Sequence, residues 1–199
     1  MHTTGTLQKA SQSYSSKIAI GEALAGFSIR AVTIAAVARI RPTDARDIFV
    51  RFVGVPSKSG QTPKSHRWFL GRRTLRLHSA FLLLSYASYR QQYEPNYDAH
   101  GIAFVLAYYN YQCLFPGQQP EISAERLALL INAGFGSRWR KIADGVSSDF
   151  EADNVKVLKC RKCAVPHLVE AHQIGYVCEE CQAATKLQKA ASPVLKLAA

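Results

Sequence analysis

The chain has 199 residues, of which 48% are hydrophobic, and this share excludes a wholly disordered chain because it is enough to build a core. Its formal net charge is +11, and it contains no run of about 18 consecutive apolar residues, which excludes a conventional membrane-spanning helix. The polar first residues lack the apolar segment of a secretory signal, so we expect a cytoplasmic protein.

The positive charge is concentrated in the first part of the chain. Residues 1–75 contain 12 Lys and Arg against 3 Asp and Glu, while the balance is 8 against 8 over 76–159 and 5 against 3 over 160–199. A solubility surface does not require such clustering, so we expect a polyanionic partner. Membrane lipid is the weaker alternative, because these basic residues are mixed with Pro and Gly rather than set on one amphipathic helix.

The first predicted helix follows an N-terminal segment, residues 1–16, which is rich in Ser, Thr and Gln and is expected to be flexible. From Lys17 onward, apolar residues recur at the i, i+4 and i+7 positions of one helical face, namely Ile20, Leu24 and Phe27. We therefore expect a helix that begins at Lys17 and buries this face.

Two short helices, over residues 33–39 and about 43–52, form a helix–turn–helix-like segment. Pro42 interrupts the pattern, Thr43 is the expected N-cap of the second helix, and Gly54 is its stop signal. The inward face of the second helix is predicted to hold Ala45, Ile48, Phe49 and Phe52, and its outward face Arg46, Val50 and Arg51. A solvated face is the competing explanation, since short helix pairs with arginines are common.

A basic loop rich in Gly, Pro and Ser is expected over residues 54–68, before three longer helices. These helices are predicted over residues 72–92, over residues 98–113, and from the N-cap Ser123 to about Gly134. Tyrosines gather in this part of the chain, and both a partner interface and ordinary core packing explain them. They are Tyr86, Tyr89, Tyr93, Tyr97, Tyr108, Tyr109 and Tyr111.

Four cysteines form two Cys-x2-Cys pairs separated by fourteen residues: Cys160, Cys163, Cys178 and Cys181. Each pair can grip a metal from one tight turn, and zinc prefers a tetrahedral thiolate set that leaves no open position for water. We therefore predict one structural zinc ion. Disulfides, free thiols and an iron–sulfur cluster are the alternatives.

The surroundings of the cysteines complete this prediction. Basic neighbours are expected to offset the charge of four thiolates; they are Lys159, Arg161, Lys162 and Lys186. His167 or His172 could replace one cysteine, whereas Cys113 is expected to be a buried apolar residue. The predicted organisation is a helical DNA- and partner-binding domain over residues 17–143, a linker over 144–158, the zinc module over 159–186 and a tail over 187–199.

Ten basic residues and two acidic ones lie between Arg39 and Arg76, with Trp68 and Phe69 among them. Basic segments of this kind contact phosphates and position a protein on nucleic acid without reading bases. The candidates for DNA contact are Arg46, Arg51, Lys58, Lys64, Arg67, Arg72 and Arg73. No phosphate-binding glycine loop, His-Glu-x-x-His motif or nucleophile elbow is present, so no enzymatic activity is expected. A zinc hydrolase or RNA-modifying enzyme would need an open position on the metal.

Taken together, these residues resemble the FlhC family, the C subunit of the bacterial flagellar master regulator. The element Pro63-x-Ser65-x-x-Trp68-Phe69, preceded by Lys58-Ser59-Gly60, is similar to the family's Pro-x-Ser-x-x-Trp-Phe element and its Lys-Gly. The helix that ends at Gly54 before a Pro/Ser-rich loop, the aromatic helical middle and the four-cysteine site also match the family pattern. The shorter loop between the cysteine pairs and the less basic tail depart from it.

The resemblance implies a mostly α protein whose C-terminal zinc site is structural and is bound by the four cysteines named above. It implies a DNA-binding subunit of a hetero-oligomeric transcriptional activator of flagellar genes. In such a complex, four FlhD-type subunits and two C chains form a heterohexamer that binds promoter DNA and acts with RNA polymerase. The alternative is a zinc-containing interaction scaffold that docks a DNA-binding partner.

Overall fold

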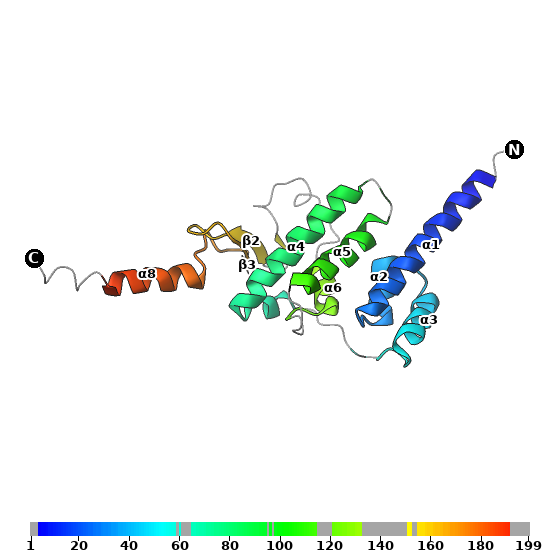
Figure 1. Ribbon diagram of the computed structural model, residues 1–199, viewed down its shortest axis with the longest axis horizontal. Coiled ribbons are helices and arrows are strands. Elements are labelled where there is room, and N and C mark those ends of the chain that lie inside the picture. The colour runs from blue at the N-terminus through cyan, green and yellow to red at the C-terminus, as the bar shows by residue number, and fades with distance from the viewer. Residues whose placement is uncertain are drawn as a thin grey trace, which may run out of the picture.

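The computed structural model confirms the prediction of a mostly helical protein with a small C-terminal cysteine module. Figure 1 shows an elongated molecule in which the helical body occupies the centre and the two termini lie at opposite ends. The structure describes residues 4–58, 60, 65–94, 96, 98–114, 121–132, 151–152 and 155–191.

Helix α1 spans Thr4–Gly26, so the prediction that it begins at Lys17 is wrong. The predicted face is correct, because Ile20 and Leu24 are buried and Phe27 is partly buried against the same core. The N-terminal part of α1 projects beyond the helical body in Figure 1. A projecting helix does not need an apolar stripe, so hydrophobic periodicity carries no signal for its first turns.

Helices α2 (Ala31–Ala38) and α3 (Pro42–Val53) form the expected helix pair. The N-cap of α3 is Arg41 rather than Thr43, because Pro42 takes the first helical position that suits its fixed φ angle. Gly54, with a φ of 79°, ends α3 in the left-handed conformation as predicted.

The two faces of α3 mostly follow the prediction. Ala45, Ile48 and Phe49 are buried, and Arg46, Val50 and Arg51 are exposed. Phe52, however, is 52% exposed, so its prediction as a core residue is wrong. The Arg51 guanidinium covers part of this ring, 5.6 Å from its centroid. The buried face of α3 therefore stops at Phe49, short of the end of the helix.

A short 3₁₀ helix, η1 (His66–Leu70), replaces the end of the expected loop, and Ser65 caps it by accepting a hydrogen bond from the Arg67 N–H. The helices that follow are α4 (Arg73–Tyr93), α5 (Ala99–Leu114) and α6 (Ala124–Asn132). Ser123 is the predicted N-cap of α6, since its hydroxyl accepts from the Arg126 N–H at 3.3 Å.

Helices α4 and α5 lie side by side at the centre of the body (Figure 1). Three of the six tyrosines described there are buried in the core: Tyr86, Tyr108 and Tyr111 are each at most 3% exposed, while Tyr109 is 59% exposed. Tyr97 lies outside the described residues. Core packing therefore explains the fully buried tyrosines, and Tyr109 is the exposed member of the group.

Gly101 of α5 permits a close approach between the N-terminal helices and the centre of the body. A Cβ atom added at Gly101 would lie 2.8 Å from Cγ2 of Ile20 and 3.5 Å from the Val37 carbonyl oxygen. A larger side chain would therefore push α1 and α2 away from α5.

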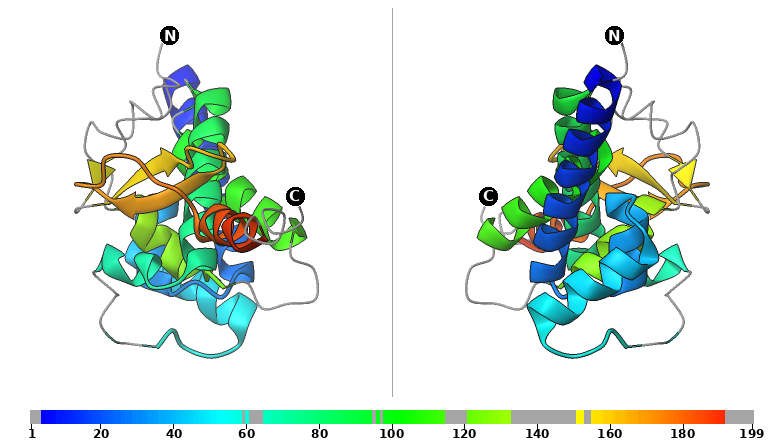
Figure 2. Two further views of the ribbon diagram at one scale, coloured as in Figure 1. Left: turned by 90° about the vertical axis from the view of Figure 1, so that its left-hand side faces the viewer. Right: turned by 90° about the vertical axis from the view of Figure 1, so that its right-hand side faces the viewer.

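Three antiparallel strands follow in the order β1 (Glu151–Ala152), β2 (Val155–Lys159) and β3 (Pro166–Glu170), and the described chain ends in helix α8 (Glu179–Ala191). Residues 155–158, assigned to a linker from the sequence, thus form most of β2. Helix α8 continues past position 186, where the zinc module was expected to end. Figure 2 views these strands and α8 along the long axis.

The sheet joins the cysteine module to the helical body. Val155, Val157 and Leu168 belong to the main core, and Val157 pairs with Leu168 across the strands. Val169, the next residue on β3, belongs instead to a smaller cluster with Cys160, Tyr176 and Cys178. The alternation of a strand therefore places one face on the body and the other on the cysteines. None of the described helices combines the length and apolarity needed to cross a membrane.

Candidate metal centre and basic surfaces

The four predicted cysteines come together at the end of the molecule that carries α8. Cys160 follows strand β2, Cys163 lies in the turn before β3, Cys178 precedes α8 and Cys181 lies in its first turn. Their sulfur atoms all lie within 4.8 Å of one another, and the Sγ atoms of Cys163 and Cys178 are 3.7 Å apart. Tetrahedral zinc with Zn–S bonds of about 2.3 Å would set its ligands about 3.8 Å apart. The cluster can therefore hold one metal ion.

The local backbone shapes the first Cys-x2-Cys turn. The N–H of Ala164 donates to the Cys160 carbonyl at 2.9 Å, and the N–H groups of Lys162 and Cys178 donate to the Cys160 sulfur at 3.4 Å. Gly175, with a φ of 92°, turns the chain back toward Cys160, and the Arg161 side chain lies against it. Donors aimed at sulfur stabilise a thiolate, which is the form that binds metal.

The thiols have unequal acidities in the absence of a cation. Hydrogen bonds from backbone N–H groups, first that of Cys163 and then that of Cys178, lower the pKa of Cys160 to about 6. Burial raises the pKa of Cys178. Hydrogen bonding to the Cys178 side chain, followed by burial, raises the pKa of Cys181 to about 12. A cation would offset these costs, so metal binding must release protons.

The other candidate ligands take no part in this cluster. His167 is buried and packs on the Tyr176 ring at a centroid distance of 5.1 Å, and burial lowers its pKa. His172 is exposed and lies 3.2 Å from a carboxylate oxygen of Glu170. Cys113 is exposed on α5, so its prediction as a buried residue is wrong.

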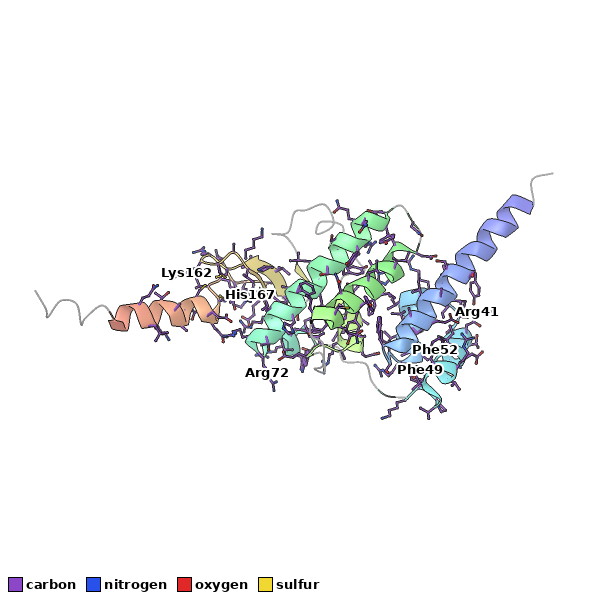
Figure 3. The ribbon with its side chains drawn as sticks, viewed as in Figure 1. Arg41, Phe49, Phe52, Arg72, Lys162 and His167 are labelled. Atoms are coloured by element: carbon purple, nitrogen blue, oxygen red, sulfur yellow. The ribbon has the colours of Figure 1, made fainter. Side chains whose placement is uncertain are left out.

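The basic candidates, close together in the sequence, fall into two groups in space. Arg46 and Arg51 lie on α3 with Lys58 just after it, whereas Arg67 lies on η1, and Arg72 and Arg73 at the start of α4. Figure 3 shows Arg72 at the lower end of α4, well separated from Arg41 beside α3. Lys64 lies outside the described residues.

Ion pairing distinguishes these cations further. Arg51 pairs with Glu22 of α1, and Arg73 pairs with Glu180 of α8 at 2.5 Å. The structure records no ion pair to another described residue for the remaining four, which are all exposed: Arg46, Lys58, Arg67 and Arg72. These four are the cations best placed to meet an anionic partner.

The described part of the Pro-x-Ser-x-x-Trp-Phe element has a clear local structure. Ser65 caps η1, Phe69 is fully buried, and Trp68 is 36% exposed with the Arg126 guanidinium 4.2 Å from its ring centroid. Helix η1 packs against β3, so this element touches the sheet that carries the cysteines. Arg126 was missed from the sequence, because only the packing of α6 brings it to Trp68.

A scan against protein-family models finds no match for the chain, and a search of curated proteins finds none either.

Proposed function

We propose that this chain is the DNA-binding subunit of a hetero-oligomeric transcriptional activator of flagellar genes, of the FlhC type, with one structural zinc ion. It acts with FlhD-type subunits, in a complex of four D and two C chains, binds promoter DNA and activates transcription with RNA polymerase. The observation that carries the proposal is the contact between η1 and β3. Through it, the Trp68-Phe69 element and the cysteine module, the two most specific parts of the resemblance, form one continuous unit.

The chemistry of the donor set supports zinc as the metal. Four sulfur ligands within 4.8 Å of one another suit a soft or borderline cation, and zinc is the usual occupant of such sites. When bound, zinc would fill its shell with protein ligands and supply structural stabilisation rather than an activated water. The role of Cys160, Cys163, Cys178 and Cys181 is then to connect β2, the turn before β3 and the start of α8.

Exposed cations beside the Trp68-Phe69 element support the assignment of DNA contact. Arg67 lies on η1 itself and Arg72 immediately before α4, and both are exposed. Side chains of this kind contact phosphates and fix the register of a protein on the duplex. Among the seven DNA-contact candidates, these two are therefore the ones that we assign to phosphate.

The test is DNA binding by the complex of this chain with its FlhD-type partner, measured by fluorescence anisotropy on a promoter duplex over a range of salt concentrations. The double variant Arg67→Ala, Arg72→Ala should weaken binding and reduce the slope of log affinity against log salt by about 2, or about 0.9 for each phosphate that is no longer neutralised. The matched control is Arg41→Ala, an exposed arginine near α3 that is paired with Asp44. An unchanged slope in the double variant would refute the phosphate assignment.

The interaction scaffold remains a second candidate function, favoured by one observation. An open hollow with apolar walls lies beside α2 and α3, and Figure 3 shows Arg72 well separated from Phe49 and Phe52 of α3. In a pure scaffold, DNA contact would belong to the partner, and the salt slope of the complex would be unaffected by changes at either surface of this chain.

A further inference from the structure

An open hollow of about 460 Å³ lies between α2, α3 and the segment that follows α3. We call it the α2–α3 hollow. Its apolar walls are Val32, which is 65% exposed, Val50, which is 44% exposed, and Pro56. Cationic side chains from α3 and the following segment, Arg46 and Lys58, complete the lining.

The exposed face of α3 extends this lining along the helix. Arg46, Val50 and Val53 are spaced i, i+4 and i+7, so they share one face of α3. Val53 is 36% exposed. An apolar stripe with a cation at one end therefore faces solvent beside the hollow.

A network of hydrogen bonds around Arg30 holds the walls in place. The Arg30 guanidinium pairs with Glu125 of α6 at 2.7 Å and donates to the Gly60 carbonyl at 3.1 Å. The Thr33 hydroxyl also donates to Glu125, and the Ala31 N–H donates to the Ser57 hydroxyl. The hollow is therefore preformed, which lowers the entropy cost of binding.

The charge of the hollow is positive. Glu125 is matched by Arg30, and Asp44 by Arg41, so neither acid neutralises Arg46 or Lys58. Asp47 is exposed and follows Arg46 in the sequence, but it is not one of the residues that line the hollow. Cations beside an exposed apolar wall complement a partner that carries both carboxylates and an apolar side chain.

Other occupants fit this surface less well. Nucleic acid would gain nothing from the exposed valines, and the first turn of α3, where a recognition helix would read bases, carries Asp44 and has Asp47 close behind. A second copy of the chain would bring Arg46 and Lys58 against the same two cations across a twofold axis. An anionic lipid surface is best met by a single basic amphipathic helix, whereas the cations here come from α3 and from the segment after it.

We propose that the α2–α3 hollow is a protein-docking site that receives an apolar side chain flanked by carboxylates from a partner protein. This inference deepens the proposed function, because it rests on the need for a protein partner and assigns that partner a surface. It also divides the basic candidates: Arg46 and Lys58 serve protein docking, while Arg67 and Arg72 serve DNA.

The experiment titrates the full-length, isotope-labelled chain with synthetic helical peptides and follows its backbone amide resonances. The test peptide carries Leu at i and i+4 with Glu on the same face; one control peptide replaces Glu by Lys, and a second replaces Leu by Ser. The test peptide should shift the resonances of Val32, Val50 and Lys58, and both control peptides should bind at least tenfold more weakly.

Two double variants separate charge from apolar contact. The double variant Arg46→Glu, Lys58→Glu should bind the test peptide at least tenfold more weakly and should prefer the Lys peptide. The double variant Val32→Ser, Val50→Ser should lower the affinity for the test peptide by a similar factor. Phe52→Ser is the matched control, since Phe52 is exposed but lies about 200° around α3 from Val50. All these positions are exposed, and circular dichroism checks that each variant keeps its helices.

Each result has a distinct meaning. No binding of the test peptide, or equal binding of all three peptides, overturns the docking site. The Arg46, Lys58 variant could instead lose binding to promoter duplex or to anionic vesicles while it still binds the peptide. That result would assign the hollow to DNA or lipid and would also overturn the docking site. If the peptide results hold while the Arg67, Arg72 salt slope is unchanged, the docking site stands and the DNA-binding proposal fails.

Discussion

The helical body and the cysteine module are stabilised by different means. The body has a large apolar core drawn from α1 to α6, with Phe104, Leu83 and Tyr111 completely buried. The module has a buried cluster of Cys160, Val169, Tyr176 and Cys178, packed against a few partly buried neighbours. So small a cluster cannot offset the conformational entropy of the module by itself. The body should therefore fold without metal, whereas the module should depend on it.

The largest expected effect comes from removing a metal ligand. Cys178→Ser, or treatment with a chelator, should abolish metal binding, whose free energy at a structural zinc site is about 10–16 kcal/mol. Hydrogen exchange should then show reduced protection in α8 and in the loop from Cys160 to Cys178, with α4 and α5 still protected. Metal content is measured by mass spectrometry, and Cys113→Ser, an exposed thiol outside the cluster, is the control.

The same site should lose metal as pH falls. Binding displaces protons from thiols, and the pKa of Cys181 near 12 without a cation means that this proton must be displaced at any physiological pH. Affinity should therefore rise with pH across the physiological range and fall steadily on acidification. A metal content that is independent of pH, or intact protection of α8 in Cys178→Ser, would contradict the view that metal holds the module together.

Truncation of a core side chain should destabilise the body and leave metal binding by the cysteine module unchanged. Leu83 is fully buried, so Leu83→Ala should lower the free energy of unfolding of the body by about 2–5 kcal/mol, because it removes buried apolar surface and leaves a cavity. Metal content should stay at one ion per chain. The control is Leu114→Ala, because Leu114 is 57% exposed and should change stability by about 0.5 kcal/mol or less. Denaturant unfolding measures both, and loss of metal in Leu83→Ala would show that the two regions fold as one unit.

The smallest effect concerns the ion pair that connects the two regions. Arg73 of α4 and Glu180 of α8 are 2.5 Å apart, with side chains 44% and 54% exposed. Solvent screening limits such a pair to about 0–1 kcal/mol. A double-mutant cycle with Arg73→Ala and Glu180→Ala measures this coupling. A larger value would indicate that the position of α8 on the body depends on this contact as well as on the shared sheet.

Local signals in the sequence were sufficient to predict several helix ends in the body. The stop at Gly54 and the N-cap at Ser123 were predicted because each depends on backbone geometry that one residue type satisfies best. The cysteine cluster was predicted from spacing, since a Cys-x2-Cys turn is itself a local structure. The first turns of α1 and the exposure of Phe52 were not predicted, because both depend on where the neighbouring helices end.

What the sequence determined by itself was therefore the helical class of the protein, the pairing of α2 with α3, and the identity of four residues that can hold a metal. Tertiary structure alone decided how the basic residues are distributed over the surface of the protein. The ten cations between Arg39 and Arg76 form one block in the chain, yet Arg41 and Arg72 lie well apart in the fold (Figure 3). The physical reason is that residues close together in the sequence need not be close in space. Helices α3 and α4 pack on separate parts of the core, and this packing sets the distance between Arg46 and Arg72 in the folded protein.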